Sequence, residues 1–597
     1  MSSPFFSLNI GASALRAAQT LVDIANQNVA NANTPGYSRQ TADVKASPAY
    51  PVPTFSNSGI PGQIGSGVEI GSITRARNAF LDYQLRGQLT SQGRWDARRD
   101  ALNQIQALTN EPSSNGLSSL MTKYWQAWQE VANSPSDTAA RASLIEQGKA
   151  VADAFNNQSQ QLKTQQRDLD QQVQLAVTDV NNYADQIAKI NLQISQVESA
   201  GMHANDLRDQ RDQLLDKLSR LVKINYVESS EGSVSVYVGN RQLVDRDVAH
   251  RIEAQTLPGQ KFAQVQWESD GAPVTLLDGK LQGVLEARDQ LVQDQLTALD
   301  KLAARVIESV NSLHTSGVGL DGKSGVKFFG GTDAGSMSVD PALLAPNGSD
   351  HVAAARMSLS TNPPPTYEFA KGDSSNAVAL GELGNAVTQR DLSQDALPST
   401  LKPGSTFGAS PSSAVLGVDV SKAPSGAAYT LGNITFNSAT STATLTTDAG
   451  GTTTVTATVT SGVDAADPSR QIVTLDTGTF RITLQAASSA SLSSVLANLN
   501  GTTLGTASAP STTGDQYGQQ VAALGVASST AASQSSNQQV LVTQLTREQQ
   551  QASGVSLDEE TTSLIQYQHA YQAAARVISV VDQMLDTLIN NTGVVGR

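Results

Sequence analysis

The eight residues from Gly317 to Ser324, GVGLDGKS, have the spacing of a phosphate-binding P-loop. A P-loop holds nucleotide phosphates with a lysine and with the backbone amides of a helix that follows a buried strand. Here the preceding residues 302–317 have a helical pattern, and the following GVKFFGG does not begin a helix. Asp321 would also place a carboxylate among the phosphates. We therefore interpret the segment as a turn that ends a helix, with a P-loop nucleotide-binding protein as a less favoured alternative.

Other side chains that could perform catalysis or bind a metal form no recognisable constellation. The five histidines stand at positions 203, 250, 314, 351 and 569, without the spacing of metal ligands. No Gly-x-Ser-x-Gly nucleophile motif is present. The acidic residues 558–560 follow Ser556 at the start of a predicted helix, where carboxylates favour the positive end of the helix dipole and contribute to capping. The sequence predicts a protein without enzyme activity, cofactor or metal.

The bulk composition restricts the class of protein and its partners. A chain of 597 residues should form several domains, because a single core rarely grows past about 300 residues. The formal charge of -14 argues against nucleic acid as a partner, since its phosphates require a basic surface. The sequence has no apolar run long enough for a transmembrane helix and no cleavable signal at the N-terminus, so we expect no membrane partner. Without cysteine, the chain forms no disulfide.

Both ends of the chain have a helical pattern with seven-residue spacing, as in coiled coils. In the N-terminal helix, a row of larger apolar residues is followed three positions later by alanines: Leu8, Leu15, Val22 and Val29, then Ala18, Ala25 and Ala32. The C-terminal helix carries two rows: Leu557, Leu564, Tyr571, Ile578 and Leu585, and Tyr567, Ala574, Val581 and Leu588. An isolated helix of this length is marginal in water. We therefore expect the terminal helices to pair with each other, and to be disordered in the free monomer.

The remaining patterns predict a mainly α fold with β insertions, in which a terminal coiled coil joins a long helical rod domain and one or two outer β-rich domains. Val173, Val180, Ile187 and Ile194 mark a coiled-coil segment, and the alternating residues 233–244 predict a hairpin. The expected domains are residues 1–50 with 554–597 (terminal coiled coil), 51–315 with 514–553 (helical rod, with a small hairpin near 226–276), 316–394 (irregular or β), and 395–513 (an inserted β domain rich in Ser, Thr, Ala and Gly).

Residues 25–40, ANQNVANANTPGYSRQ, end the first helix with an unusual number of amide side chains. The residue before a proline disfavours the helical conformation, so the helix must end before Thr34. Pro35 and Gly36 fit the centre of a type II turn, with glycine at positive φ. The asparagines at 26, 28, 31 and 33 exceed what capping requires, which suits packing among many copies. The candidate assembly residues of this segment are Asn28, Asn31, Asn33, Thr34, Pro35, Gly36 and Tyr37.

This segment resembles the N-terminal signature of bacterial flagellar rod, hook and hook-associated proteins. Residues 67–86 and 553–589 resemble further segments of that family, although Asn78 stands where the family has an aspartate. Residues 116–141, 205–222 and 278–289 resemble the hook-associated members. Residues 395–512 resemble no family that we can identify.

The resemblance implies a structural protein of the bacterial flagellum that is exported unfolded by the type III apparatus and joins hook to filament. The terminal helices would line an axial tube, in a ring of about eleven copies. The implied partners are other copies of the chain, the hook protein, the next junction protein (hook-associated protein 3) and an export chaperone that binds the C-terminal helix. The implied contacts are the turn residues above and the larger residues of the terminal rows. A secreted adhesin or surface-layer protein, supported only by the threonine-rich β region, is a second alternative.

Overall fold

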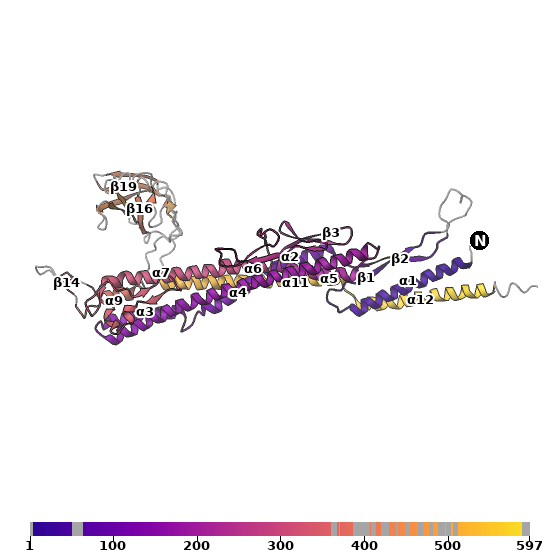
Figure 1. Ribbon diagram of the computed structural model, residues 1–597, viewed down its shortest axis with the longest axis horizontal. Helices are drawn as coiled ribbons and strands as arrows, with labels where there is room; N and C mark the ends of the chain where they lie inside the picture. Colours follow the sequence, from indigo (N-terminus) through magenta and orange to yellow (C-terminus); the bar gives the residue numbers. More distant parts are fainter. Residues whose placement is uncertain are drawn as a thin grey trace, which may run out of the picture. The chain divides into compact units, whose positions relative to one another are not determined.

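The computed structural model describes residues 4–49, 64–356, 370–385 and 512–587, with individual strands and residues between 358 and 504. The chain forms two compact units, each assembled from segments that are distant in the sequence. The first contains Met1–Leu108, Gln161–Gln295 and Leu524–Arg597, and the second contains Thr109–Gln160 and Leu296–Ala523. The predicted mainly α fold with β insertions is confirmed (Figure 1). The four domain boundaries given above remain predictions.

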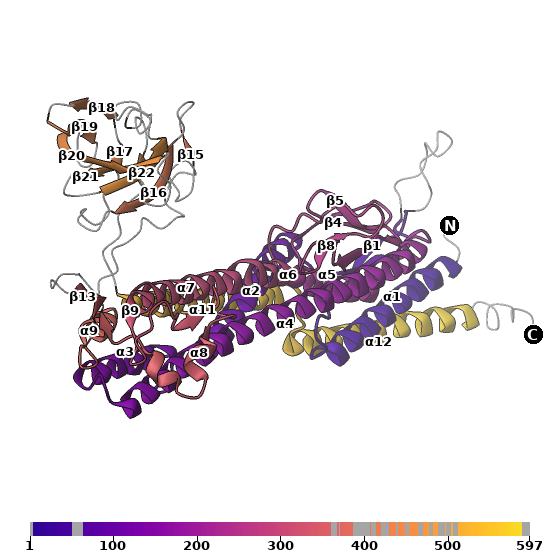
Figure 2. The ribbon, with the colours of Figure 1, turned by 60° about the vertical axis from the view of Figure 1, so that its left-hand side comes forward.

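In the first unit the two terminal helices pair, as their seven-residue spacing predicted. α1 (Pro4–Asn31) and α12 (Leu557–Asp586) lie side by side in both ribbon views (Figures 1 and 2). They are antiparallel, since Gly11 lies next to Ile578 and Asn28 contacts Glu560. The antiparallel strands β1 (Gln40–Ala46) and β2 (Val68–Arg75) pack against α1. Segments more than 500 residues apart therefore form one element of the fold.

Helices of different lengths supply most of the remaining core. They are α2 (Ala79–Thr109), α4 (Thr138–Glu198), α5 (Asn205–Leu221), α6 (Lys280–Glu286), the short π-helix η2 (Ala287–Leu291), α7 (Val292–Ser316) and α11 (Thr513–Ser553). The predicted coiled-coil residues Val173, Val180, Ile187 and Ile194 of α4 are all fully buried, so this prediction is confirmed. None of the described helices has the length and hydropathy needed to cross a membrane.

Two small sheets complete the first unit. The strands β3 (Ile224–Glu228), β4 (Val234–Val238), β5 (Arg241–Asp245) and β6 (Val248–Ala249) form an antiparallel sheet in that order. β7 (Ile252–Gln255) pairs with β8 (Gln264–Trp267). The predicted hairpin at 233–244 is the β4–β5 pair, and Gly239 in its turn has a φ of 60°.

The second unit has an aromatic core beside α3 (Leu117–Asn133). Tyr124, Trp128, Phe328 and Phe329 are fully buried, and their rings contact one another at tilted or edge-on angles. Short elements surround this core: the strand pairs β9 (Gly317–Val318) with β12 (Ala355–Arg356), β10 (Phe329–Gly330) with β11 (Ser338–Val339), and β13 (Ser358–Leu359) with β14 (Tyr367–Glu368), and the helices α8 (Pro341–Leu344), η3 (Gly348–His351) and α9 (Ser375–Glu382).

His314 is buried in this aromatic core as a neutral imidazole. Its Nε2 accepts a hydrogen bond from the backbone N–H of Ala353 at 3.0 Å, so Nδ1 carries the proton and donates to the carbonyl of Val326 at 2.7 Å. The ring also packs against Trp128 and Phe328. Burial, which removes the imidazole from water, lowers the pKa of His314 to about 4. This histidine is therefore a core residue whose two ring nitrogens are both hydrogen-bonded within the chain.

Replacing His314 by glutamine is expected to remove an acid-dependent loss of stability. The unfolded imidazole takes up a proton near pH 6.5, whereas the folded one does so only near pH 4. The folded state binds fewer protons between these values, so its stability is complete above pH 6.5 and falls by about 3 kcal/mol as the pH drops towards 4. Glutamine keeps a donor and an acceptor but does not titrate. Urea unfolding of both proteins at neutral and acid pH measures the difference, and an equal acid loss in both would contradict the prediction.

The residues between 406 and 504 form a β region within the second unit. A seven-stranded antiparallel sheet has the order β15 (Thr406–Phe407), β16 (Ser413–Asp419), β22 (Arg481–Ala487), β21 (Arg470–Asp476), β20 (Thr453–Val463), β19 (Thr442–Thr447) and β18 (Gly432–Asn437). β17 (Tyr429–Thr430) pairs with β23 (Thr503–Leu504). In β20, Ala457 and Val459 are buried while Thr456 and Thr458 are exposed, so the period-two pattern correctly predicted strands here.

Candidate assembly site

The contact between α1 and α12 is built mainly from small residues. At Gly11, an added Cβ atom would lie 3.0 Å from Cγ1 of Ile578. The two helices therefore approach closely at this point, and a larger side chain at position 11 would require the side chain of Ile578 to move or to be replaced by a smaller one. The buried small residues of the pair are Ala17, Ala18 and Ala25 of α1 and Ala574 and Val581 of α12.

The larger residues of the predicted rows are only partly covered within one chain. Half-buried members are Leu8, Leu15, Val22 and Val29 on α1, and Leu564, Tyr567, Ile578 and Leu585 on α12. Leu557 and Tyr571 are exposed, and Leu588 lies outside the described residues. The pairing of the two ends thus leaves apolar surface that a second copy of the chain could bury.

A further apolar surface lies along α12 at the edge of its contact with α1, since Cγ1 of Val577 would lie 3.5 Å from a Cβ atom added at Gly11. Val577, Val580 and Met584 follow one another at the i, i+3, i+7 spacing of one helix face. Their exposed fractions are 47%, 47% and 57%. We call these three residues the α12 strip. Contiguous exposed apolar surface of this kind is characteristic of sites of protein–protein contact.

The turn after α1 has the conformation that the sequence predicted. The helix ends before Thr34, whose carbonyl accepts a hydrogen bond from the N–H of Tyr37 at 3.2 Å. Gly36 has a φ of 77°, as a type II turn with Pro35 and Gly36 at its centre requires. Nε2 of Gln213 in α5 donates to the carbonyl of Pro35 at 2.9 Å. A Cβ atom at Gly36 would meet only the Gln213 side chain, which can move, so the requirement for glycine comes from the positive φ.

Asn28 connects α1, the turn and α12, which the sequence did not reveal. It is 1% exposed. Its Oδ1 accepts hydrogen bonds from Tyr37 Oη at 2.9 Å and Gln40 N at 3.0 Å. Its Nδ2 donates to the carbonyl of Gln40 at 2.9 Å and to Oε2 of Glu560 at 3.1 Å. All hydrogen-bonding positions of the amide are used within the chain. This corrects the expectation that Asn28 is a surplus amide for a neighbouring copy.

The other asparagines of the segment differ from Asn28. Asn31 is half-buried and bonds locally: its Nδ2 donates to the carbonyl of Gln27 at 3.0 Å, and its Oδ1 accepts from Thr34 Oγ1 at 3.1 Å. Asn33 is exposed, as are Thr34, Pro35 and Gly36. These residues remain candidates for contacts between copies.

Glu560 has a second role that the sequence interpretation did not include, beside its place in the first turn of α12. Ser556 does cap α12, because its side chain accepts a hydrogen bond from the N–H of Glu559. Glu560, however, is buried against α1 and forms an ion pair with Nε of Arg39 at 2.9 Å. A signal was available: Glu560 stands seven residues before Tyr567 and so extends the buried row by one position.

A buried charge network anchors the turn to α5. Both the N–H and the Oγ of Ser38 donate to the carboxylate of Asp209, at 2.7 and 2.6 Å. Arg75 of β2 pairs with Asp209 and Asp212, each at 2.7 Å, and Arg86 of α2 pairs with Asp212 at 2.9 Å. Burial alone would raise the pKa of Asp212, but the neighbouring arginines hold it at about 2. The carboxylate is therefore ionised, and the network fixes the turn, β2, α2 and α5 together.

The P-loop-like segment does not have the geometry of a phosphate site. α7 ends at Ser316, directly before Gly317, and no helix begins directly after Ser324. Asp321 accepts a hydrogen bond from the N–H of Lys323 at 3.1 Å and forms an ion pair with His351 at 2.8 Å. The Lys323 side chain is exposed. The interpretation as a helix-ending turn is therefore confirmed, and nothing in the described geometry favours the nucleotide-binding alternative.

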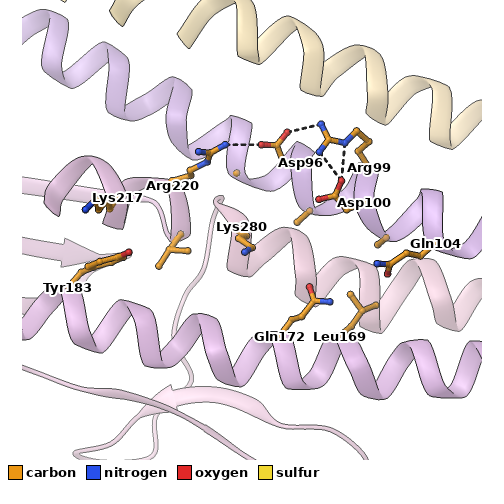
Figure 3. A pocket seen from close by; sticks show the side chains of 14 residues that line it. Asp96, Arg99, Asp100, Gln104, Leu169, Gln172, Tyr183, Lys217, Arg220 and Lys280 are labelled. Carbon is orange, nitrogen blue, oxygen red and sulfur yellow. Dashed lines mark hydrogen bonds and ion pairs between the residues drawn. The ribbon is translucent and has the colours of Figure 1, made fainter. Parts of the chain in front are cut away.

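The polar pocket in Figure 3 is lined by two acidic and four basic side chains, of which Asp96, Asp100, Arg99 and Arg220 form ion pairs. It has a volume of about 430 Å³ between α2, α4, α5 and the start of α6. Asp96 pairs with Arg99 at 3.2 Å and with Arg220 at 3.1 Å, and Arg99 also pairs with Asp100 at 2.8 Å. None of the described lining residues is a histidine or a serine. Among the described residues, no three acidic or histidine side chains cluster as metal ligands would. The notable chemistry of the chain is therefore that of helix packing.

Comparison with known proteins identifies matching families for a central helical segment and for both ends of the chain. Residues 102–329 match the family described as the flagellar hook-associated protein FlgK helical domain. Residues 549–591 match the C-terminal region of flagellar basal body rod FlgEFG proteins, and residues 8–37 match the flagella basal body rod protein family. The two terminal matches cover most of α12 and α1.

Curated relatives extend the similarity to the whole chain. Flagellar hook-associated protein 1 of Bacillus subtilis (strain 168) is 27% identical over 629 residues, covering 100% of both chains. Flagellar hook-associated protein 1 of Escherichia coli (strain K12) is 27% identical over 608 residues, covering 98% of this chain and 99% of the relative. The solved structure of the flagellar hook junction protein FlgK from Burkholderia pseudomallei is 19% identical, with a TM-score of 0.46, and covers 78% of this chain and 99% of that chain.

Proposed function

Since the chain belongs to the family of flagellar hook-associated protein 1, a family of structural proteins of the bacterial flagellum, we propose that it is the junction protein that joins hook to filament. In this role it is a mechanical adaptor without catalysis. Its terminal helix pair inserts into the axial tube of the flagellum, and the rest of the chain contacts the structures on either side. None of the relatives named above is an adhesin, so that alternative is not developed.

The observation that carries this proposal is the exposed α12 strip on a helix pair made from both ends of the chain. Val577, Val580 and Met584 would be a liability on a protein that works alone, because exposed apolar surface promotes association. These side chains are already about half covered, so burying the remainder against neighbouring copies would contribute roughly 0.7–1.5 kcal/mol each, half of the value for full burial. The small residues of the α1–α12 contact allow the pair to be narrow, which suits dense packing around a tube.

The proposed assembly is a ring of about eleven copies, built by heterologous contacts between successive subunits. We propose that it binds the hook protein on one side and the next junction protein, hook-associated protein 3, on the other, outside the cell. An export chaperone would cover α12 before assembly, since the α12 strip is exposed in the single chain. Assembly would further stabilise the α1–α12 pair that the single chain already forms.

Deleting residues 1–40 is expected to abolish assembly while leaving a folded remainder, because the deletion removes α1 and the turn but none of the other helices. The test is electron microscopy of a strain that lacks the protein, complemented with the full chain or with the deleted chain. We expect filaments with the first, and hooks without filaments and shed filament protein with the second. Circular dichroism of the purified deleted chain controls for folding. Filaments on hooks that carry only the deleted chain would refute the proposed function.

A further inference from the structure

The apolar contact between α1 and α12 repeats every seven residues, so apolar packing alone does not define a single alignment of the two helices. Gly11, Ala18 and Ala25 recur at this spacing on α1, and Tyr567, Ala574 and Val581 on α12. A shift by seven residues moves one helix about 10.5 Å along the other and brings similar side chains opposite each other again. Small residues also offer little steric resistance to such a shift. Some other feature must select the observed alignment.

We propose that Asn28, Glu560 and Arg39 form a register lock that selects this alignment. Asn28 donates to Glu560 Oε2 at 3.1 Å, and Arg39 pairs with Glu560 Oε1 at 2.9 Å. Arg39 is itself held in place, because its N–H donates to the carbonyl of Ser553, just before α12, at 2.8 Å. The lock therefore involves α1 (Asn28), the residues after the turn (Arg39), and residues just before and just after the start of α12 (Ser553 and Glu560). A single buried polar contact is known to fix alignment in helix pairs.

The sequence makes the lock unique to one alignment. In the buried row of α12, the acidic residue at 560 is followed at seven-residue intervals by Tyr567, Ala574 and Val581. A shift in one direction brings Leu21 opposite Glu560, which would bury a carboxylate without a partner. A shift in the other direction brings Asn28 opposite Tyr567 and moves Glu560 beyond the end of α1. Both shifts leave a buried polar group unsatisfied, which is strongly unfavourable.

This inference goes beyond the proposed function, because it concerns which alignment the helix pair adopts rather than what the pair assembles into. The lock also connects the aligned helix pair to the turn and to α5. The amide of Asn28 binds Tyr37 and Gln40, while Ser38 binds Asp209 of α5. These bonds anchor α1, so a shift in which α1 itself moved would break the connection to the rest of the first unit. The lock thus sets both the position of α12 along α1 and the conformation of the turn.

Cross-linking of the full chain tests the lock, and the absence of native cysteine makes it a clean experiment. One reporter carries Gly11→Cys with Ile578→Cys, which are adjacent in the observed alignment. The other carries Ala18→Cys with Ile578→Cys, which become adjacent only after a shift by seven residues. Each reporter is made in the native background, with Asn28→Leu and Glu560→Leu together, and with the control pair Asn26→Leu and Gln566→Leu, whose side chains are exposed.

We expect the native and control backgrounds to form the first cross-link at least about 50-fold faster than the second, because a disulfide requires Cα atoms within about 7 Å. Removing the lock should reduce this ratio to within about threefold, since both alignments then bury comparable apolar surface. In a chain that keeps Asn28, the single substitution Glu560→Gln should retain most of the preference for the first cross-link, because the glutamine oxygen still accepts a hydrogen bond from Asn28.

Three results would overturn the proposal: comparable cross-linking in the native background, a preference that survives removal of the lock, or loss of both cross-links in the lock-free chain. The last would mean that the contact only stabilises the pair. Cross-linking is measured on the isolated chain, whereas the hook–filament role is tested in cells. A negative result in the cross-linking test would therefore not contradict the hook–filament role, and a negative result in cells would not contradict the lock.

Discussion

Replacing Asp212 by alanine is expected to lower the free energy of unfolding of the first unit by about 3 kcal/mol, among the largest effects of any single substitution in this chain. The carboxylate is buried between Arg75 and Arg86, at 2.7 and 2.9 Å, with Arg77 at 3.6 Å. Removing it leaves guanidinium groups in the interior with less compensating charge. Each arginine retains one other acidic partner, which places the expected loss at the lower end of the range for broken buried ion pairs.

The control for Asp212→Ala is Asp43→Ala, which breaks an exposed ion pair with Lys45 and is expected to change stability by less than about 0.5 kcal/mol. Because the chain has two units, hydrogen exchange resolved by segment is the appropriate measurement. Protection should fall in β2, α2 and α5 and remain unchanged around the aromatic core of the second unit. A loss below about 1 kcal/mol, or one equal in both units, would contradict this account of the network.

The same carboxylate predicts a dependence on acid. The folded pKa of Asp212 is about 2, below the ordinary value of 3.8, so the folded state holds fewer protons between these values. The stabilisation by this group is complete above pH 3.8 and is lost as the pH falls towards 2. The Asp212→Ala protein should therefore lose less stability than the native chain over this interval.

The features that the sequence predicted correctly are those with local or periodic causes. Thr34-Pro35-Gly36 permits few backbone conformations, so both the end of α1 and the type II turn follow from three residues. The seven-residue rows similarly predicted the pairing of α1 with α12, because the period and the apolar character of a helix are properties of its own sequence and do not depend on the rest of the chain. The alternating residues of β4, β5 and β20 are a third instance.

The features that the sequence did not predict depend on partners that are distant in the chain. Asp209 and Asp212 lie on a helix rich in charge, NDLRDQRDQLLDK, where charged residues are normally exposed. They are buried because Arg75, Arg86 and Ser38 approach from other elements. Asn28 and Glu560 are 532 residues apart, so the sequence around either residue does not indicate that the two are partners. Charge pairing of this kind is determined by tertiary packing, so local patterns indicate only which helices meet.

Replacing Val577 and Val580 by lysine is expected to abolish assembly without unfolding the chain. Both side chains are about half exposed in the α12 strip, and although Val577 borders Gly11 of α1, long lysine side chains can extend into solvent from these positions. Lysine is a better helix former than valine. The isolated chain should therefore keep its helical content and its thermal midpoint. In the proposed ring, by contrast, each charge would be buried against an apolar surface of a neighbouring copy.

The magnitude decides the outcome. If each desolvated ammonium costs about 3 kcal/mol, every contact between copies weakens by more than 100-fold, and a ring requires all its contacts at once. The control variant, Gln572→Lys with Gln583→Lys, adds the same two charges to α12 at exposed polar positions outside the strip. In a strain that lacks the native protein, the control should restore filaments and motility, and the strip variant should leave bare hooks. If both variants assembled, the strip would not be a contact between copies. If both failed, net charge rather than the strip would explain the loss, and the assembly surface would have to be sought in the half-buried residues of the α1–α12 seam.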